Sequence, residues 1–308
     1  MTYAPIVIFV YNRADHFTKT YNALSLCPEA RESDLIIFSD GAKNAEGQQA
    51  VDLVRKAADE AAKKNDFKSV TVIKREKNWG LAASIIDGVT DVLNKYGCII
   101  VLEDDVLASP YLLKYFNKAL DFYKNDKSVG CLAGYTPKLD LGDYDKDVFA
   151  ARRSCSCCWA TWKDRWEGVD WSMGFMKDFY SDYSLVKALN SNGNDRFMRL
   201  YRQSKKNSQS WSIRFGAHLI MNNYMTVYPR YSYIENIGCD LSGVHSAVED
   251  AKSMEVDLEK AIADPRFESL TPDPRIQKIL YRFYSGSTLR ALRREAVTRA
   301  VWLRERLS

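Results

Sequence analysis

The sequence has 308 residues, 46% apolar and 27% charged, which is the composition of a globular protein with ample material for a core. This composition excludes a disordered chain, a collagen and a small disulfide scaffold. The net charge of +4 is too small to indicate nucleic-acid binding. The charge is uneven, however, because residues 276–308 contain eight basic and two acidic residues, which leaves the rest slightly acidic.

The first hundred residues alternate between strand and helix patterns. Continuous apolar or alternating runs predict strands at 6–10, 35–38, 69–73 and 98–102. Helical spacing or helix-favouring composition predicts helices at 17–26, 47–64 and 81–93. This alternation indicates an α/β fold with a mostly parallel, doubly wound sheet, in which ligands bind at the carboxyl ends of the strands.

The pattern changes after residue 109. A helix is expected at 111–123, and residues 131–233 form an aromatic region punctuated by glycines. Two further helical segments are expected at 248–263 and 276–308, separated by proline-containing turns. These last helices have the pattern of an appendage to the main domain.

Three consecutive carboxylates, Glu103, Asp104 and Asp105, directly follow an apolar strand. Adjacent carboxylates repel each other and resist burial unless a cation or several donors compensate their charge. Carboxylate oxygens suit Mg²⁺ or Mn²⁺, which commonly connect a protein to the phosphates of a nucleotide. The triplet therefore indicates a divalent-metal site, with an acidic surface turn as the alternative.

Polar residues follow other predicted strands as well. Asp40 can accept hydrogen bonds from ribose hydroxyls or a base N–H, and Arg13 can bind a phosphate or a carboxylate. The loop from Asn78 to Gly80 leads into a helix whose free N–H groups could face an anion or the base. Each residue has an alternative as a solvated loop residue, but together they outline one nucleotide.

Six segments occur in a characteristic order along the chain. They are Val10-Tyr11-Asn12-Arg13, Ser39-Asp40-Gly41, Asn78-Trp79-Gly80-Leu81, Glu103-Asp104-Asp105, Cys158 to Trp166, and Asn236 to His245. This order resembles the GT-A glycosyltransferases. Within them it is most similar to the group containing N-acetylglucosaminyltransferase I and bacterial enzymes that build surface polysaccharides. The resemblance spans about residues 4–245.

The resemblance implies a GT-A fold, a Rossmann-like doubly wound mixed sheet flanked by helices. It divides residues 1–245 into a nucleotide-sugar half, 1–107, and an acceptor half, 108–245. Residues 246–308 then form a helical, basic C-terminal extension.

The resemblance also implies roles for single residues. The donor-binding residues would be Arg13, Asp40, Asn78, Gly80, Ser84, Glu103 and Asp104. Asp40 would contact the uracil of a UDP-sugar, and Glu103 and Asp104 its sugar or ribose. Asp105 would ligate a Mn²⁺ or Mg²⁺ ion that bridges the diphosphate, and His245 would be a second ligand of the metal or the phosphate.

An inverting transfer also needs a base that takes the proton of the acceptor hydroxyl. Where the animal enzyme of the group has Trp-Asp-Asp, this chain has Trp211-Ser212-Ile213, without a carboxylate. Asp240 is the first alternative candidate and Asp170 the second. The tryptophans between Trp159 and Trp171 form either a platform for the acceptor sugar or part of the core.

The C-terminal segment has an apolar stripe at helical spacing, flanked by arginines. The stripe consists of Leu289, Leu292, Ala296, Ala300, Leu303 and Leu307. Such a helix can lie on an anionic membrane surface, or dock on its own domain or on a second subunit. The sequence shows no signal peptide or membrane-spanning run, and seven cysteines indicate reduced thiols. We therefore expect a cytoplasmic protein, peripheral on the inner face of the membrane.

These features predict a metal-dependent, inverting hexosyl- or N-acetylhexosaminyltransferase. It would move a sugar from a UDP-sugar to a hydroxyl of a glycan or lipid-linked acceptor, in bacterial surface polysaccharide synthesis. One alternative is a nucleotidyltransferase, although residues 10–15 lack the glycine-rich phosphate loop that it would need. The other is a non-catalytic, nucleotide-sugar-binding descendant of the fold.

Overall fold

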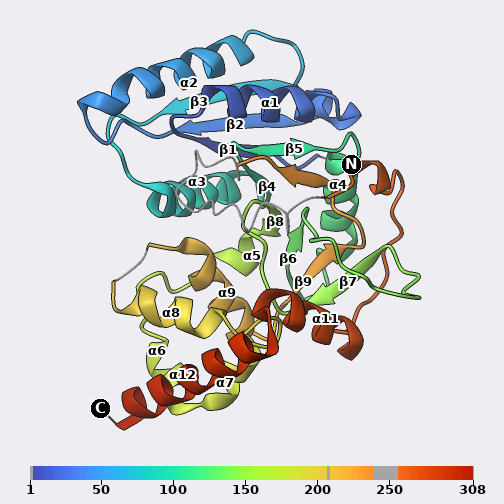
Figure 1. The fold of residues 1–308 in the computed structure, drawn as a ribbon. Helices are drawn as coiled ribbons and strands as arrows, with labels where there is room; N and C mark the ends of the chain where they lie inside the picture. The colour runs from blue at the N-terminus through green and yellow to red at the C-terminus, as the bar shows by residue number, and fades with distance from the viewer. Residues whose placement is uncertain (1–2, 207–208, 239–255, 308) are drawn as a thin grey trace.

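The computed structural model describes residues 3–206, 209–238 and 256–307 (Figure 1). Its N-terminal strands are β1 (Ile6–Val10), β2 (Asp34–Ser39), β3 (Ser69–Lys74) and β4 (Cys98–Glu103). The helices of this part are α1 (Ala14–Ser25), α2 (Gln48–Ala61), α3 (Leu81–Tyr96) and α4 (Leu112–Tyr123), with short turns η1 (Pro28–Glu32) and η2 (Ala45–Gly47). The predicted alternation of strands and helices is confirmed.

One sheet runs through the molecule. Its further strands are β6 (Val129–Ala133), β7 (Val148–Ala151), β8 (Cys158–Trp162) and β9 (Met225–Pro229). The strand order is β3-β2-β1-β4-β8-β6-β9-β7. The first four are parallel, whereas β8 runs antiparallel to both β4 and β6, so the sheet is mixed. A separate antiparallel ribbon joins β5 (Val106–Ala108) to β10 (Ile234–Asn236).

Helices cover both faces of the sheet, which explains why β1 is a continuous apolar run (Figure 1). Ile6, Ile8 and Val10 point into the core with α1 and α4. Val7 and Phe9 point into the opposite core with α3. The edge strand β3, by contrast, alternates between exposed and partly buried residues, as its sequence predicts.

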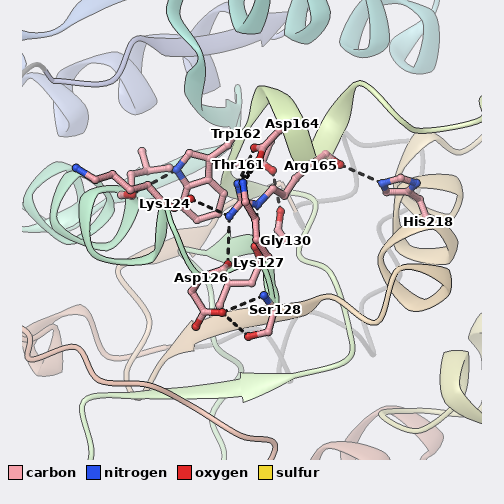
Figure 2. Close-up of polar contacts among 12 residues, drawn as sticks. Lys124, Asp126, Lys127, Ser128, Gly130, Thr161, Trp162, Asp164, Arg165 and His218 are labelled. Carbon is pink, nitrogen blue, oxygen red and sulfur yellow. Dashed lines mark hydrogen bonds and ion pairs between the residues drawn. The ribbon is translucent and has the colours of Figure 1, made fainter.

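A buried arginine fixes the point where the sheet continues into the second half (Figure 2). Arg165, on the short helix α5 (Lys163–Trp166), is only 1% exposed. Its Nε donates to the carbonyl oxygen of Val129 (3.2 Å), and its Nη2 to those of Lys124 (3.0 Å) and Asp126 (3.1 Å). Its Nη1 pairs with Asp164 (2.5 Å). Arg165 therefore ties the turn after α4 to the end of β8.

The second half adds a helical layer and the C-terminal helices. They are α6 (Met176–Ser181), α7 (Tyr183–Leu189), α8 (Arg196–Ser204), α9 (Trp211–Met221), α11 (Pro274–Ser285) and α12 (Thr288–Leu307). Within the expected helix 248–263, the described residues 256–263 contain only the turn η3 (Leu258–Lys260), so this part of the prediction is wrong. The expected helix 276–308 is two helices, because Gly286 ends α11 with a positive φ of 76°.

Both C-terminal helices pack on the rest of the chain. Ile276 and Leu280 of α11 are buried against Phe149 and Tyr228 of the sheet in one core cluster. On α12, the buried Trp302 donates from Nε1 to the carbonyl oxygen of Phe179 (3.0 Å). Among the described helices, none combines the length and the apolar composition that crossing a bilayer requires.

Candidate functional site

A cavity of about 750 Å³ opens at the carboxyl ends of β1, β2 and β4 and extends into the second half. It is lined by each predicted donor or metal residue with a described position: Arg13, Asp40, Asn78, Gly80, Ser84, Glu103, Asp104 and Asp105. This agrees with the rule that parallel strands present their ligand site at one edge. The structure therefore brings these residues together.

Asp40 organises the loop that follows β3. Its Oδ1 accepts hydrogen bonds from the N–H groups of Gly41 (3.0 Å) and Trp79 (2.9 Å), and its Oδ2 from that of Gly80 (2.9 Å). The Asn78 side chain donates to the carbonyl oxygen of Gly41 (2.8 Å) and closes the same turn. Three of the roughly four lone-pair positions of the carboxylate are thus used by the backbone. The sequence interpretation missed this structural role.

The acidic triplet is not a surface turn. Asp104 and Asp105 are buried, with 5% and 7% of their surface exposed. The Nη2 atom of Arg13 pairs with Asp104 and donates to Oδ2 of Asp105 (2.9 Å). Arg13 therefore binds carboxylates in this structure, which is one of the two interactions that its sequence position suggested.

One guanidinium group does not balance three carboxylates. Burial raises the pKa of Asp104 to about 6, an effect that Arg13 opposes and the charge of Asp105 reinforces. Burial also raises the pKa of Glu103 well above its usual value, and both neighbouring aspartates add to this. Ionisation of the triplet is therefore unfavourable by itself, and a bound cation would favour it.

The segment after β10 holds Asp105 in place. Asn236 donates from Nδ2 to Oδ1 of Asp105 (3.2 Å), and the N–H of Ile237 donates to the Asp105 carbonyl oxygen (2.8 Å). A Cβ at Gly238 would collide with Oδ2 of Asp105, so only glycine allows this approach. The sequence analysis included Asn236 and Gly238 in a motif but gave them no role.

The donor set fits a hard cation that keeps other ligands. Among the described residues no group of three His, Cys, Asp or Glu side chains could hold a metal ion. Asp105, with Asp104 beside it, would therefore supply one or two carboxylate oxygens. Mg²⁺ and Mn²⁺ commonly bind in this way, with substrate phosphates and water completing the coordination.

Two predicted residues, Asp240 and His245, lie outside the described residues. The second base candidate, Asp170, does not line the cavity, and its Oδ1 accepts from the N–H (2.9 Å) and Oγ (2.5 Å) of Ser172. In the described part of the cavity wall, the carboxylates are Asp40 and the acidic triplet alone. Ser212 lines the cavity where the resemblance would place a carboxylate.

The tryptophans between Trp159 and Trp171 belong to the core. Trp159 is fully buried, and its ring lies 5.6 Å from that of Trp166 and 5.0 Å from that of Trp211. Trp171 packs on Trp166, with 4.8 Å between the ring centroids. None of these tryptophans lines the cavity. The core interpretation is therefore confirmed for the buried Trp159, Trp162 and Trp166, and Trp171 is partly buried against the cluster that contains Trp159 and Trp166. These tryptophans form no acceptor platform in the described cavity wall.

The second half supplies cavity residues that the sequence analysis missed. They include Arg153, Ser154, Cys155, Ser156, Cys157, Arg196, Arg199, Tyr228 and Tyr284. One available signal was the dipeptide Arg152-Arg153, which directly follows an apolar strand, as Asp104 follows β4. Tyr284 gave no such signal, because it reaches the cavity from α11.

The family model described as "Glycosyl transferase family 2" matches residues 6–207. A search of curated proteins found no match.

The solved structures that resemble this one do so weakly. A cytidylyltransferase from Leptospira borgpetersenii is 13% identical, with 55% of this chain and 64% of that chain covered and a TM-score of 0.32. Glucosyl-3-phosphoglycerate synthase from Mycobacterium tuberculosis, in complex with Mn²⁺, UDP and its product, is 10% identical, with 53% and 57% covered and a TM-score of 0.35. The galactosyltransferase LgtC is 10% identical, with 73% and 72% covered and a TM-score of 0.36.

The match thus spans less than two thirds of the first two of these proteins. The family model, in contrast, covers most of this chain, from β1 through α8, and includes the acidic triplet. The chain therefore belongs to glycosyl transferase family 2 and has the GT-A fold that its sequence predicts.

Proposed function

We propose that this protein is a metal-dependent, inverting glycosyltransferase that uses a UDP-sugar. The observation that carries the proposal is the buried pair Asp104 and Asp105, for which Arg13 is the one salt-bridge partner among the described residues, in a cavity wide enough for a nucleotide sugar. The acceptor would be a hydroxyl of a glycan or of a lipid-linked sugar. The ordered motifs that resemble bacterial surface-polysaccharide enzymes support a role in that synthesis.

The residues of the nucleotide half would each act on the donor. Asp40 fixes the 78–80 loop against which the base would lie, and Glu103 and Asp104 would accept hydrogen bonds from sugar hydroxyls. Arg13 and Asn236 orient the two oxygens of Asp105. A Mn²⁺ or Mg²⁺ ion bound by Asp105 would supply Lewis-acid stabilisation of the charge that develops on the leaving diphosphate.

The acceptor hydroxyl would attack the anomeric carbon from the face opposite the diphosphate. Its proton must go to a base as the new bond forms. The described cavity wall places no carboxylate on the acceptor side, so we retain Asp240 as the base. His245 remains our candidate for a second ligand of the metal or the phosphate.

Nucleotide-sugar binding is the primary test of this function. We expect UDP-sugars to raise the unfolding temperature more with Mn²⁺ than with EDTA, because a ligand of the native state stabilises it. Asp105→Asn should abolish the Mn²⁺-dependent part, since losing even a group that only supports a metal ligand weakens metal binding by about 10–100-fold. The measurement is a thermal-shift series over UDP-, GDP-, CDP- and TDP-sugars.

Controls separate this function from its alternatives. Asp170→Asn is the matched carboxylate control, because Asp170 lies outside the cavity and should leave donor binding and UDP release unchanged. Asp240→Asn should keep donor binding but lower acceptor-dependent UDP release. UDP binding without turnover over a broad acceptor panel would favour a non-catalytic protein, and pyrophosphate release from nucleoside triphosphates a nucleotidyltransferase.

The apolar stripe of the basic helix α12 is exposed to solvent. The stripe residues Leu289, Leu292, Leu303 and Leu307 are 79%, 61%, 52% and 85% exposed. The helix α12 instead docks through Thr298 and Trp302. Within the part of the chain that the structure describes, the stripe therefore does not dock on its own domain, and a second subunit is the alternative to a membrane. We propose that the stripe and its exposed flanking arginines bind an anionic membrane surface.

Vesicle binding tests this membrane role. We expect Leu292→Ser/Leu303→Ser to lose cosedimentation with vesicles of phosphatidylcholine and phosphatidylglycerol, while wild type binds them and not phosphatidylcholine alone. The matched control is Leu26→Ser/Leu53→Ser, which changes two exposed leucines elsewhere. Deleting the helix is a poorer test because it also removes the buried Trp302. Equal binding by the stripe variant and wild type would refute the proposal.

A further inference from the structure

The part of the cavity wall that comes from the second half of the chain is basic. Arg153, Arg196 and Arg199 line it, and we refer to these three residues as the arginine group. Asp195 forms salt bridges with Arg153 (2.9 Å) and Arg199 (3.8 Å). Among the described residues no salt bridge reaches Arg196. One carboxylate thus faces three guanidinium groups.

Arg196 is the least compensated member of the arginine group. It is 3% exposed, and its Nη2 donates to Oγ of Ser154 (3.2 Å). Its buried Nη1 has no hydrogen-bond partner among the described residues. Burial lowers the pKa of Arg196 to about 9, and the charge of Arg153 adds to this effect. A buried cation in this state is costly unless an anion binds beside it.

The surrounding structure holds the arginine group in place. The guanidinium of Arg153 stacks on the ring of Tyr284 (3.7 Å to the centroid) and donates to both oxygens of Asp195 (2.9 and 3.2 Å). The hydroxyl of Tyr228 donates to the Arg153 carbonyl oxygen (2.9 Å). A Cβ at Gly216 of α9 would collide with Nη2 of Arg196. This preorganisation is typical of a binding site rather than of solvated surface arginines.

We propose that the arginine group binds a phosphate group of the acceptor substrate. The proposal rests on the proposed function, which assigns the acidic triplet and its cation to the donor diphosphate and leaves the arginine group for the second substrate. A phosphate carries nearly two negative charges and three acceptor oxygens. It therefore matches both the excess charge of the arginine group and the forked donors of its guanidinium groups.

Inorganic phosphate is the probe for the first experiment. With UDP and Mn²⁺ at saturation, we expect potassium phosphate to raise the unfolding temperature more than potassium chloride of equal ionic strength. Arg196→Gln and Arg199→Gln should weaken phosphate binding by about tenfold or more, as expected for loss of a charge-assisted hydrogen bond. Arg199 is 46% exposed, so its variant should fold even if the Arg196 variant does not.

Arg202→Gln is the matched control. Arg202 lies on the same helix, α8, is exposed and does not line the cavity, so its loss removes the same charge from the protein. Wild type and this control should respond to phosphate alike. Equal phosphate responses from all four proteins, or none from wild type, would overturn the proposal.

A second measurement distinguishes the two sources of phosphate, the acceptor and the donor. Arg199→Gln should leave the Kd for UDP with Mn²⁺ unchanged. If that Kd rises as much as the Kd for phosphate, the arginine group serves the donor diphosphate and the proposal is wrong. In turnover, wild type should prefer a hexose phosphate to the same hexose as acceptor, and Arg199→Gln should lose this preference.

Failure of the proposed function gives a different result. Wild type would then bind no UDP-sugar, with or without Mn²⁺. The phosphate titration is therefore repeated without UDP on wild type, Arg199→Gln and Arg202→Gln. A response that depends on Arg199 but not on Arg202 would show phosphate binding by the arginine group on its own.

Discussion

Two of the buried arginines, Arg165 and Arg196, are in opposite situations. Arg165 lies between the sheet and the turn after α4, and each of its nitrogens donates to an oxygen of the fold (Figure 2). Arg196, in the cavity, donates from Nη2 to Ser154, and its Nη1 has no partner among the described residues. The comparison teaches that burial of a charge does not by itself indicate function. Function is indicated instead by a buried charge that the fold leaves without enough partners.

The largest effect expected from this comparison is on stability. Arg165→Met should lower the free energy of unfolding by about 3 kcal/mol, because it removes the donor to the buried carbonyl oxygen of Val129 and to two part-buried carbonyl oxygens, and an unsatisfied buried acceptor costs about 1–3 kcal/mol. Arg196→Met should change it by only about 1 kcal/mol, because an apolar side chain replaces a poorly compensated charge. Urea titrations with equal m-values would measure both. Equal destabilisation by the two variants would contradict the distinction.

A smaller effect is expected at the glycine beside Arg196. Gly216→Ala would place a methyl group against Nη2 of Arg196, and such overpacking costs about 1–3 kcal/mol. The helix preference for alanine offsets about 1 kcal/mol of this cost, so the protein should fold. The phosphate response should nevertheless weaken, because Arg196 must move.

Gly168→Ala is the control for this glycine variant. The nearest atom to its new Cβ would be Cε1 of His218, at 3.4 Å, which is an ordinary contact. The control should therefore keep the full phosphate response. A full response from Gly216→Ala as well would mean that Arg196 does not need its present position to bind the anion.

The sequence predicted the N-terminal half of the fold well for a physical reason. Strands such as β1 and β4 are covered on both faces, so they form continuous apolar runs that stand out from the helices between them. The strands β7 and β8 lie in an aromatic region without such contrast. Their order in the sheet depends on contacts between distant segments, including the bonds of Arg165 to residues 124–129.

The residues of the candidate site likewise divide into those that the sequence could identify and those that it could not. Arg13, Asp40 and the acidic triplet could be found because each follows a strand, and parallel strands end at one edge. Arg153, Arg196 and Tyr284 come from a loop and two helices that only the tertiary fold brings together. No spacing in the sequence connects them. The exposed stripe of α12 was recognised from its spacing, but Trp302 on the docking face was not.

The stacking of Tyr284 on Arg153 limits the distance between the arginine group and the start of helix α12. Four peptide units separate Tyr284 from Thr288, where α12 begins, so these two residues lie at most about 14 Å apart. The ring that stacks on the arginine group is therefore only a few residues away, along the chain, from the start of the proposed membrane-binding helix. A phosphate bound by the arginine group would be only a short tether away from that helix, so a long glycan spacer between lipid and phosphate would be unnecessary.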